Sequence, residues 1–174
     1  MKKNNYWLAF FLLTILQIII CNYFNFSQYV MLSVLPVIVL LVPVRYSTII
    51  TMVVAFVTGM AVDMLAEGGL LGINALSLVP VAFCRNKILD LVFGEEVFSR
   101  KEDISIERFG VMKMSMAIIL AQLLFFLIYN TADGAGTRPF WFNAVRFVAS
   151  NLASYVVAII LAVFLSRENR SGWR

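Results

Sequence analysis

The chain has 174 residues, of which 61% are hydrophobic and 14% are charged, and its mean hydropathy is +0.89. A water-soluble domain is typically about 45–50% apolar and about 25% charged, so this composition excludes a soluble globular protein. One helical span takes roughly 20 residues, so the chain has room for about six spans. It contains no histidine, which excludes imidazole-based hydrolases, histidine-ligated zinc sites and most haem proteins.

Six apolar stretches follow one another along the chain and predict six transmembrane helices. Their continuous apolar runs lack the alternation that strands of a membrane β-barrel require. The helices are expected at about residues 6–21, 29–44, 47–66, 70–84, 111–129 and 143–166. The segment 85–110 then forms a cytoplasmic loop. Residues 1–174 are therefore predicted to form a single all-α polytopic membrane domain.

Lysine and arginine predict the orientation of the chain, because cytoplasmic loops of membrane proteins carry an excess of both. With a cytoplasmic N-terminus, twelve of the fourteen basic residues fall on the cytoplasmic side. They are Lys2, Lys3, Arg45, Arg85, Lys87, Arg100, Lys101, Arg108, Lys113, Arg167, Arg170 and Arg174. Six spans return the C-terminus to the cytoplasm. The net charge of +4 then reflects topology and contact with anionic membrane lipids, and it requires no nucleic acid as a partner.

Asp63 is the main charged residue at membrane depth, about one turn before the outer end of the third span. A carboxylate at the centre of a span costs about 2.5–3.5 kcal/mol on insertion, so the groups around Asp63 must offset part of this cost. Two interpretations remain open. Asp63 is either an interfacial carboxylate in contact with water or the partner of Arg146, a basic residue at comparable depth in the sixth span. The ion pair is the hypothesis that a structure can test.

Small and polar residues near Asp63 predict close helix packing. Gly59 follows Ala55 at small-xxx-small spacing, which lets a second helix approach. Gly72 belongs to a glycine-rich turn, where glycine supplies backbone freedom, and Asn74 is expected to hydrogen-bond across a helix interface. The predicted structural or partner-binding residues are therefore Gly59, Asp63, Gly72, Asn74 and Arg146.

The sequence patterns of membrane enzymes are absent. Asp133-Gly134 lacks the second carboxylate of a metal-dependent phosphatidyl transferase, and there is no G-x-S-x-G nucleophile motif, P-loop or dinucleotide fingerprint. The polar rings of a channel and the internal repeats of a broken-helix transporter are missing as well. We therefore predict no catalytic activity, no metal site and no cofactor.

Four short motifs follow one another between residues 35 and 83. They are Leu35-Pro36, Pro43-Val44-Arg45-Tyr46, F-x-x-G-Φ-x-x-D over residues 56–63 with Met60 at Φ, and L-G-x-x-A-L over residues 71–76. In this order the motifs resemble the central region of the rod shape-determining protein MreD family. The resemblance implies six spans and a fold similar to the S-components of energy-coupling factor transporters. It also implies a non-enzymatic scaffold or regulator of lateral peptidoglycan synthesis and cell shape.

The resemblance also implies location and partners. The protein is expected in a bacterial inner membrane with both termini in the cytoplasm. Its expected partners are an MreC-like single-span protein, the MreB filament, reached directly or through other proteins, RodA and its class B penicillin-binding partner. Partner helices are expected to pack around Gly59, Asp63 and the fourth span.

The alternative is a vitamin-binding S-component of an energy-coupling factor transporter, which would share the size and the number of spans. S-components usually carry a stripe of small residues on the first helix, where the coupling subunit docks. In the first span of this chain Ala9 is the only alanine, and bulky side chains surround it in the sequence. This difference favours the scaffold.

Overall fold

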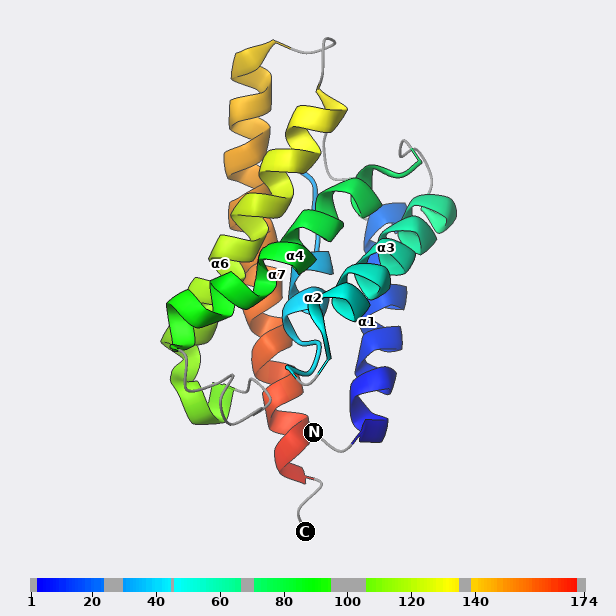
Figure 1. The fold of residues 1–174 in the computed structure, drawn as a ribbon. Coiled ribbons are helices and arrows are strands. Elements are labelled where there is room, and N and C mark those ends of the chain that lie inside the picture. Colours follow the sequence, from blue (N-terminus) through cyan, green and yellow to red (C-terminus); the bar gives the residue numbers. More distant parts are fainter. Residues whose placement is uncertain are drawn as a thin grey trace.

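The computed structural model describes residues 3–23, 30–44, 46–66, 71–94, 106–134 and 139–171. The helices in these ranges are α1 (Lys3–Tyr23), α2 (Leu35–Leu40), α3 (Thr48–Leu65), α4 (Ile73–Phe93), α6 (Ile106–Asp133) and α7 (Phe140–Ser171). Figure 1 shows α4 crossing the middle of the bundle, with α3 and α1 on one side and α6 and α7 on the other. The first turn of α1 and the last turn of α7 lie at the same end.

Three helices among the described residues are long and apolar enough to span a bilayer. They are Thr48–Leu65 in α3, Gly110–Asp133 in α6 and Phe140–Phe164 in α7, and a shorter apolar helix covers Phe10–Tyr23 in α1. Large hydrophobic side chains are exposed on all four, as expected where lipid replaces water as the surrounding medium. The chain is therefore a helical membrane protein, in agreement with its composition.

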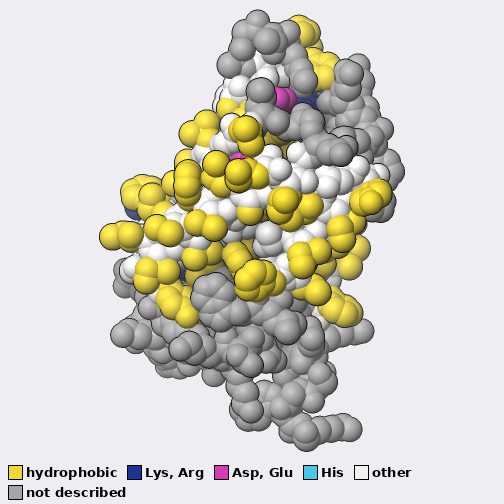
Figure 2. All heavy atoms as spheres, turned by 90° about the vertical axis from the view of Figure 1, so that its right-hand side faces the viewer, with side chains coloured by type: hydrophobic (Ala, Val, Ile, Leu, Met, Phe, Trp, Pro, Cys, Tyr) yellow, Lys and Arg dark blue, Asp and Glu magenta, His cyan; other side chains and the backbone are white. Residues whose placement is uncertain are grey.

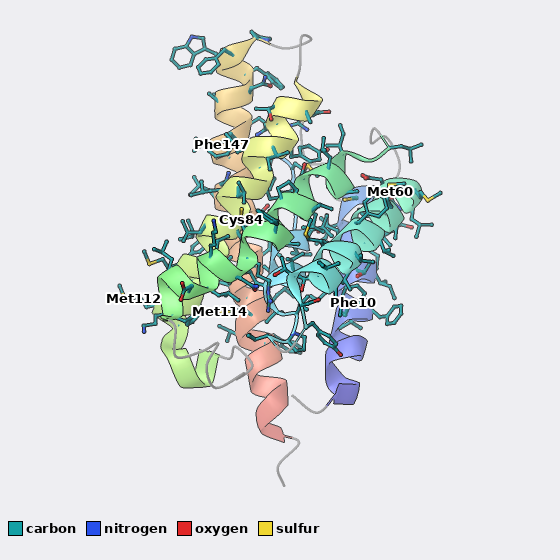
Figure 3. The ribbon with its side chains drawn as sticks, in the orientation of Figure 1. Phe10, Met60, Cys84, Met112, Met114 and Phe147 are labelled. Carbon is teal, nitrogen blue, oxygen red and sulfur yellow. The ribbon has the colours of Figure 1, made fainter. Side chains whose placement is uncertain are left out.

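Helix α6 changes direction at Gly110, whose φ of 81° and ψ of 158° are not helical. Beyond this kink the helix has a lipid-facing and an inward face. Met112 is 87% exposed whereas Met114 is 2% exposed, and Figure 3 shows these two residues near the start of the apolar part of α6. The predicted span at 111–129 is thus part of a longer helix with a break at its beginning.

The prediction of one continuous helix over residues 29–44 is wrong. Residues 31–34 are not helical, and α2 contains six residues, all of them buried. Pro36 occupies the first turn of α2, where its missing N–H removes no intrahelical hydrogen bond. The apolar run at this position reflects burial inside the protein, which hydropathy does not distinguish from burial in lipid.

Gln17 of α1 binds the non-helical backbone that precedes α2. Its Oε1 accepts a hydrogen bond from the Val34 N–H at 2.7 Å, and its Nε2 donates to the Leu32 carbonyl at 3.2 Å. Gln17 is fully buried. Because hydrocarbon offers no hydrogen bonds, backbone of this kind is stable at membrane depth only where protein groups replace those of a helix.

Two serines of α7 bind the same segment from the other side. Ser150 Oγ accepts from the Met31 N–H at 2.9 Å, and Ser154 Oγ accepts from the Ser33 N–H at 3.0 Å. Both serines are buried. The segment before α2 is therefore held between α1, which precedes it in the sequence, and α7, which lies about 120 residues further along the chain.

Candidate functional site

Asp63 lies in the last turn of α3 and is only 4% exposed. Its Oδ2 accepts hydrogen bonds from the backbone N–H groups of Gly72 at 3.0 Å, Asn74 at 3.1 Å and Ala75 at 3.3 Å. Its Oδ1 accepts from the side-chain Nδ2 of Asn74 at 2.7 Å. These backbone groups belong to the first turn of α4, where N–H groups have no partner within their own helix.

The Asp63 carboxylate therefore supplies the capping hydrogen bonds at the N-terminus of α4, a helix other than its own. Gly72 occupies the N-cap position of α4 and has no side chain to bind the first N–H groups. A carboxylate at this place both accepts these hydrogen bonds and interacts favourably with the positive end of the helix dipole. The backbone N–H donors of α4 thus offset the cost of burying the carboxylate, and no basic residue is needed.

Gly72 makes this geometry possible through its backbone conformation. Its φ is 92°, in the left-handed region that favours glycine. A Cβ added at Gly72 would meet no atom within 4 Å. The left-handed backbone, and not a lack of space, therefore favours glycine here. The turn at Gly72 directs the first N–H groups of α4 towards Asp63.

Gly59 allows the two helices to come close enough for these hydrogen bonds. A Cβ at Gly59 would lie 2.4 Å from Ala75 Cα and 2.6 Å from Ala75 N. Gly59 and Asp63 are four residues apart and lie on the same face of α3. The predicted close helix approach at Gly59 is confirmed, and the helix that approaches is α4 of the same chain.

The hypothesis that Asp63 pairs with Arg146 is wrong. Arg146 on α7 forms an ion pair with Asp133 at the end of α6, and the two side chains are 12% and 16% exposed. The Arg146 guanidinium also lies over the Tyr129 ring, 5.9 Å from its centroid. Asp133 lies opposite Arg146, while Asp63 already accepts hydrogen bonds from four donor groups at the start of α4.

The packing of partner helices around Gly59, Asp63 and the fourth span stays a prediction, but a partner would not contact Gly59 or Asp63 directly. Both residues are buried within the chain. Asn74 is likewise buried and donates to Asp63. Four of the five predicted residues, namely Gly59, Asp63, Gly72 and Asn74, therefore meet at one internal junction of α3 and α4, whereas Arg146 belongs to the α6–α7 hairpin.

Arg85 is a structurally important residue that the sequence interpretation placed incorrectly, in the predicted loop 85–110. Helix α4 continues to Phe93, and Arg85 is 1% exposed. Its Nη2 donates to the carbonyls of Leu40, at 3.3 Å, and Val42. The last carbonyls of a helix lack intrahelical partners and attract cations, so Arg85 stabilises the end of α2. Residues 95–105 of the predicted loop lie outside the described residues.

A sequence signal for this longer helix exists. Leu89 and Phe93 follow Arg85 at steps of four residues, and both are buried in the structure. Such spacing indicates one buried helical face. The arginine on that face is thus directed into the protein.

At the junction of α3 and α4 both oxygens of the buried Asp63 carboxylate accept hydrogen bonds from α4. In the part of the chain that the structure describes, no group of three or more His, Cys, Asp or Glu residues is placed to hold a metal ion. Comparisons with protein-family models, curated proteins and solved structures found no match.

Proposed function

We propose that the chain is a non-enzymatic scaffold in a bacterial inner membrane that supports lateral peptidoglycan synthesis and thereby cell shape. The observation that carries this proposal is the convergence of the motif residues. Gly59 and Asp63, from the first long motif of the MreD resemblance, contact Gly72 and Ala75 from the second. The two motifs thus specify one rigid helix junction, a role that suits a scaffold better than an enzyme.

The proposed topology has six membrane segments, formed by α1, α2, α3, α4, α6 and α7, with a fold similar to the S-components. In this topology α2 is a short segment enclosed by protein. Because α1 begins and α7 finishes at the same end of the bundle, an even number of crossings is consistent with both termini in the cytoplasm. The excess of basic residues in the predicted cytoplasmic segments supports the same orientation.

The proposed partners are an MreC-like single-span protein, RodA and its class B penicillin-binding partner, with the MreB filament bound directly or through them. Since Gly59 and Asp63 are internal, they would act on partners by fixing the angle between α3 and α4. The partners themselves would contact outward-facing side chains. This arrangement separates residues that shape the scaffold from residues that touch its partners.

Depletion of the protein in its own rod-shaped host tests the proposal. We expect rounded cells, rescue by the wild-type chain, and recovery of an MreC-like protein with the tagged scaffold from native membranes. Gly59→Leu should fail to rescue, because the side chain would collide with α4. Leu152→Phe, a change at an exposed position of α7, is the matched control and should rescue. Unchanged rods together with tight vitamin binding by the purified protein would overturn the proposal in favour of an S-component.

A further inference from the structure

Polar side chains join α6 to α7 at two levels of the bundle. Asp133 pairs with Arg146 near one end of the two helices. Nearer the other end, the hydroxyl groups of Ser115 and Tyr155 are hydrogen-bonded at 2.7 Å. Asn151 lies on α7 between Arg146 and Tyr155, so it occupies an intermediate level between the two pairs.

The amide of Asn151 is only partly satisfied by the chain itself. Its Nδ2 donates to the Phe147 carbonyl at 2.8 Å, one turn earlier in α7. Its Oδ1 accepts no hydrogen bond from a described residue and is not enclosed by the surrounding atoms. Gln122 of α6 does not donate to it, because the Gln122 Nε2 is buried without a hydrogen bond. An open acceptor therefore remains on a half-buried side chain.

Asn151 lies near the middle of an apolar helix that is long enough to span a membrane. This span is Phe140–Phe164, and Asn151 follows its first residue by 11 positions and precedes its last by 13. Acyl chains offer no hydrogen bonds, so an open amide at this depth costs free energy until another polar group binds it. The open acceptor therefore favours a protein neighbour over lipid.

The side chains around Asn151 form an apolar surface. Val148 of α7 is 55% exposed, and Ile119 and Leu123 of α6, which lie between the levels of the two pairs, are each 38% exposed. The outer face of α3 differs, because all its exposed and half-buried side chains in residues 49–65 are apolar. Figure 2 shows hydrophobic side chains spread over the described part of the side on which α3 lies. Asn151 thus distinguishes the surface at α7 from one that lipid alone can cover.

We propose that two copies of the chain associate through this surface, and that the Asn151 amides of the two copies form reciprocal hydrogen bonds. An asparagine amide contains both a donor and an acceptor, so it is complementary to itself. Two copies in the same orientation are related by a twofold axis along the membrane normal, which places both amides at the same depth. Hydrogen bonds of this kind stabilise the association of membrane helices. A second copy is the occupant for which the chain itself supplies the complementary group. This inference is independent of the proposed function.

Disulfide crosslinking in membranes tests the inference on the full chain. Cys21 and Cys84 are replaced by Ala, and one cysteine is introduced as Val148→Cys on α7 or Val57→Cys on α3, at positions 55% and 59% exposed. We expect crosslinked dimers with Val148→Cys and none with Val57→Cys. Dimers with Val57→Cys alone would overturn the inference, and so would crosslinks of Val148→Cys to a different protein only.

Energy transfer between labelled chains in vesicles measures the dissociation constant and the contribution of the amide. Asn151→Leu should weaken association about tenfold, the effect of two interhelical hydrogen bonds of typical strength. Asn151→Gln keeps the amide and should retain most of the affinity. Gln122→Leu, which removes a buried amide of α6, is the matched control and should leave the affinity unchanged.

Two results of this measurement would overturn the inference. One is a wild-type chain that stays monomeric at every density in the vesicle. The other is an equal affinity for the wild type and Asn151→Leu, because the dimer would then use another surface. Asn151→Ala is a second variant without the amide and replaces Asn151→Leu if that variant fails to fold.

Discussion

Two aspartates, Asp63 and Asp133, lie in the last turn of an apolar helix, and the protein balances their charges in different ways. Asp63 accepts hydrogen bonds from neutral N–H groups at the start of α4, whereas Asp133 pairs with Arg146 of α7. Asp63 is also the more deeply buried residue. The comparison shows that a carboxylate in the membrane region does not require a cation when a helix N-terminus supplies the donors.

The difference arises from the part of the neighbouring helix that faces each aspartate. Helix α4 begins beside Asp63, and its first N–H groups are directed at the carboxylate. After α6 the chain enters α7, and Arg146 lies on the face of α7 opposite Asp133. Helix direction thus decides which type of partner an aspartate meets.

Replacing Asp63 should have the largest effect. Asp63→Ala removes the acceptor of three backbone N–H groups and of the Asn74 amide. Each unsatisfied buried donor costs about 1–3 kcal/mol, so we expect the free energy of unfolding to fall by at least about 3 kcal/mol. Unfolding in mixed detergent micelles measures this change. Asp63→Asn retains one carbonyl oxygen and should lose less; equal losses for the two variants would contradict the capping role.

Gly59→Ala should have the next largest effect. Its methyl group would lie 2.4 Å from Ala75 Cα, so α4 must move away and lengthen the hydrogen bonds to Asp63. Overpacking of this kind typically costs about 1–3 kcal/mol. The same unfolding experiment measures it. Ala61→Val, at a half-buried position on α3, is a control that should change stability little.

Double-mutant cycles measure directly how strongly each of the two aspartates interacts with Arg146. Asp133→Asn and Arg146→Gln should show a coupling energy of about 1–2 kcal/mol, between the values of exposed and fully buried ion pairs. Asp63→Asn and Arg146→Gln should be additive within about 0.5 kcal/mol. Strong coupling of Asp63 with Arg146 would restore the ion-pair hypothesis that the structure contradicts.

Gly72→Ala should have the smallest effect of the set. The left-handed conformation at φ 92° costs a residue with a Cβ about 1–2 kcal/mol, while the surroundings leave room for the methyl group. We expect a loss of stability of this size with the helix junction intact. Hydrogen exchange of the first amides of α4 checks whether the junction stays intact, because unprotected amides would show that their hydrogen bonds to Asp63 had broken.

The sequence predicted those features that depend on local composition. Continuous apolar runs indicated helices that span a membrane, and the spacing of Ala55, Gly59 and Asp63 indicated one face of α3 that another helix approaches. Both conclusions follow from helical periodicity and from the free energy of transferring side chains out of water. Neither requires knowledge of which element lies opposite.

The tertiary structure decided which groups meet. Asp63 caps α4, Arg85 binds the end of α2, and Gln17 with two serines of α7 binds the backbone before it. Hydropathy describes how much a segment avoids water, and it is nearly the same for a helix in lipid and for a segment enclosed by protein. The partners of buried polar groups depend on distances and directions between elements far apart in sequence, so only the assembled bundle determines them.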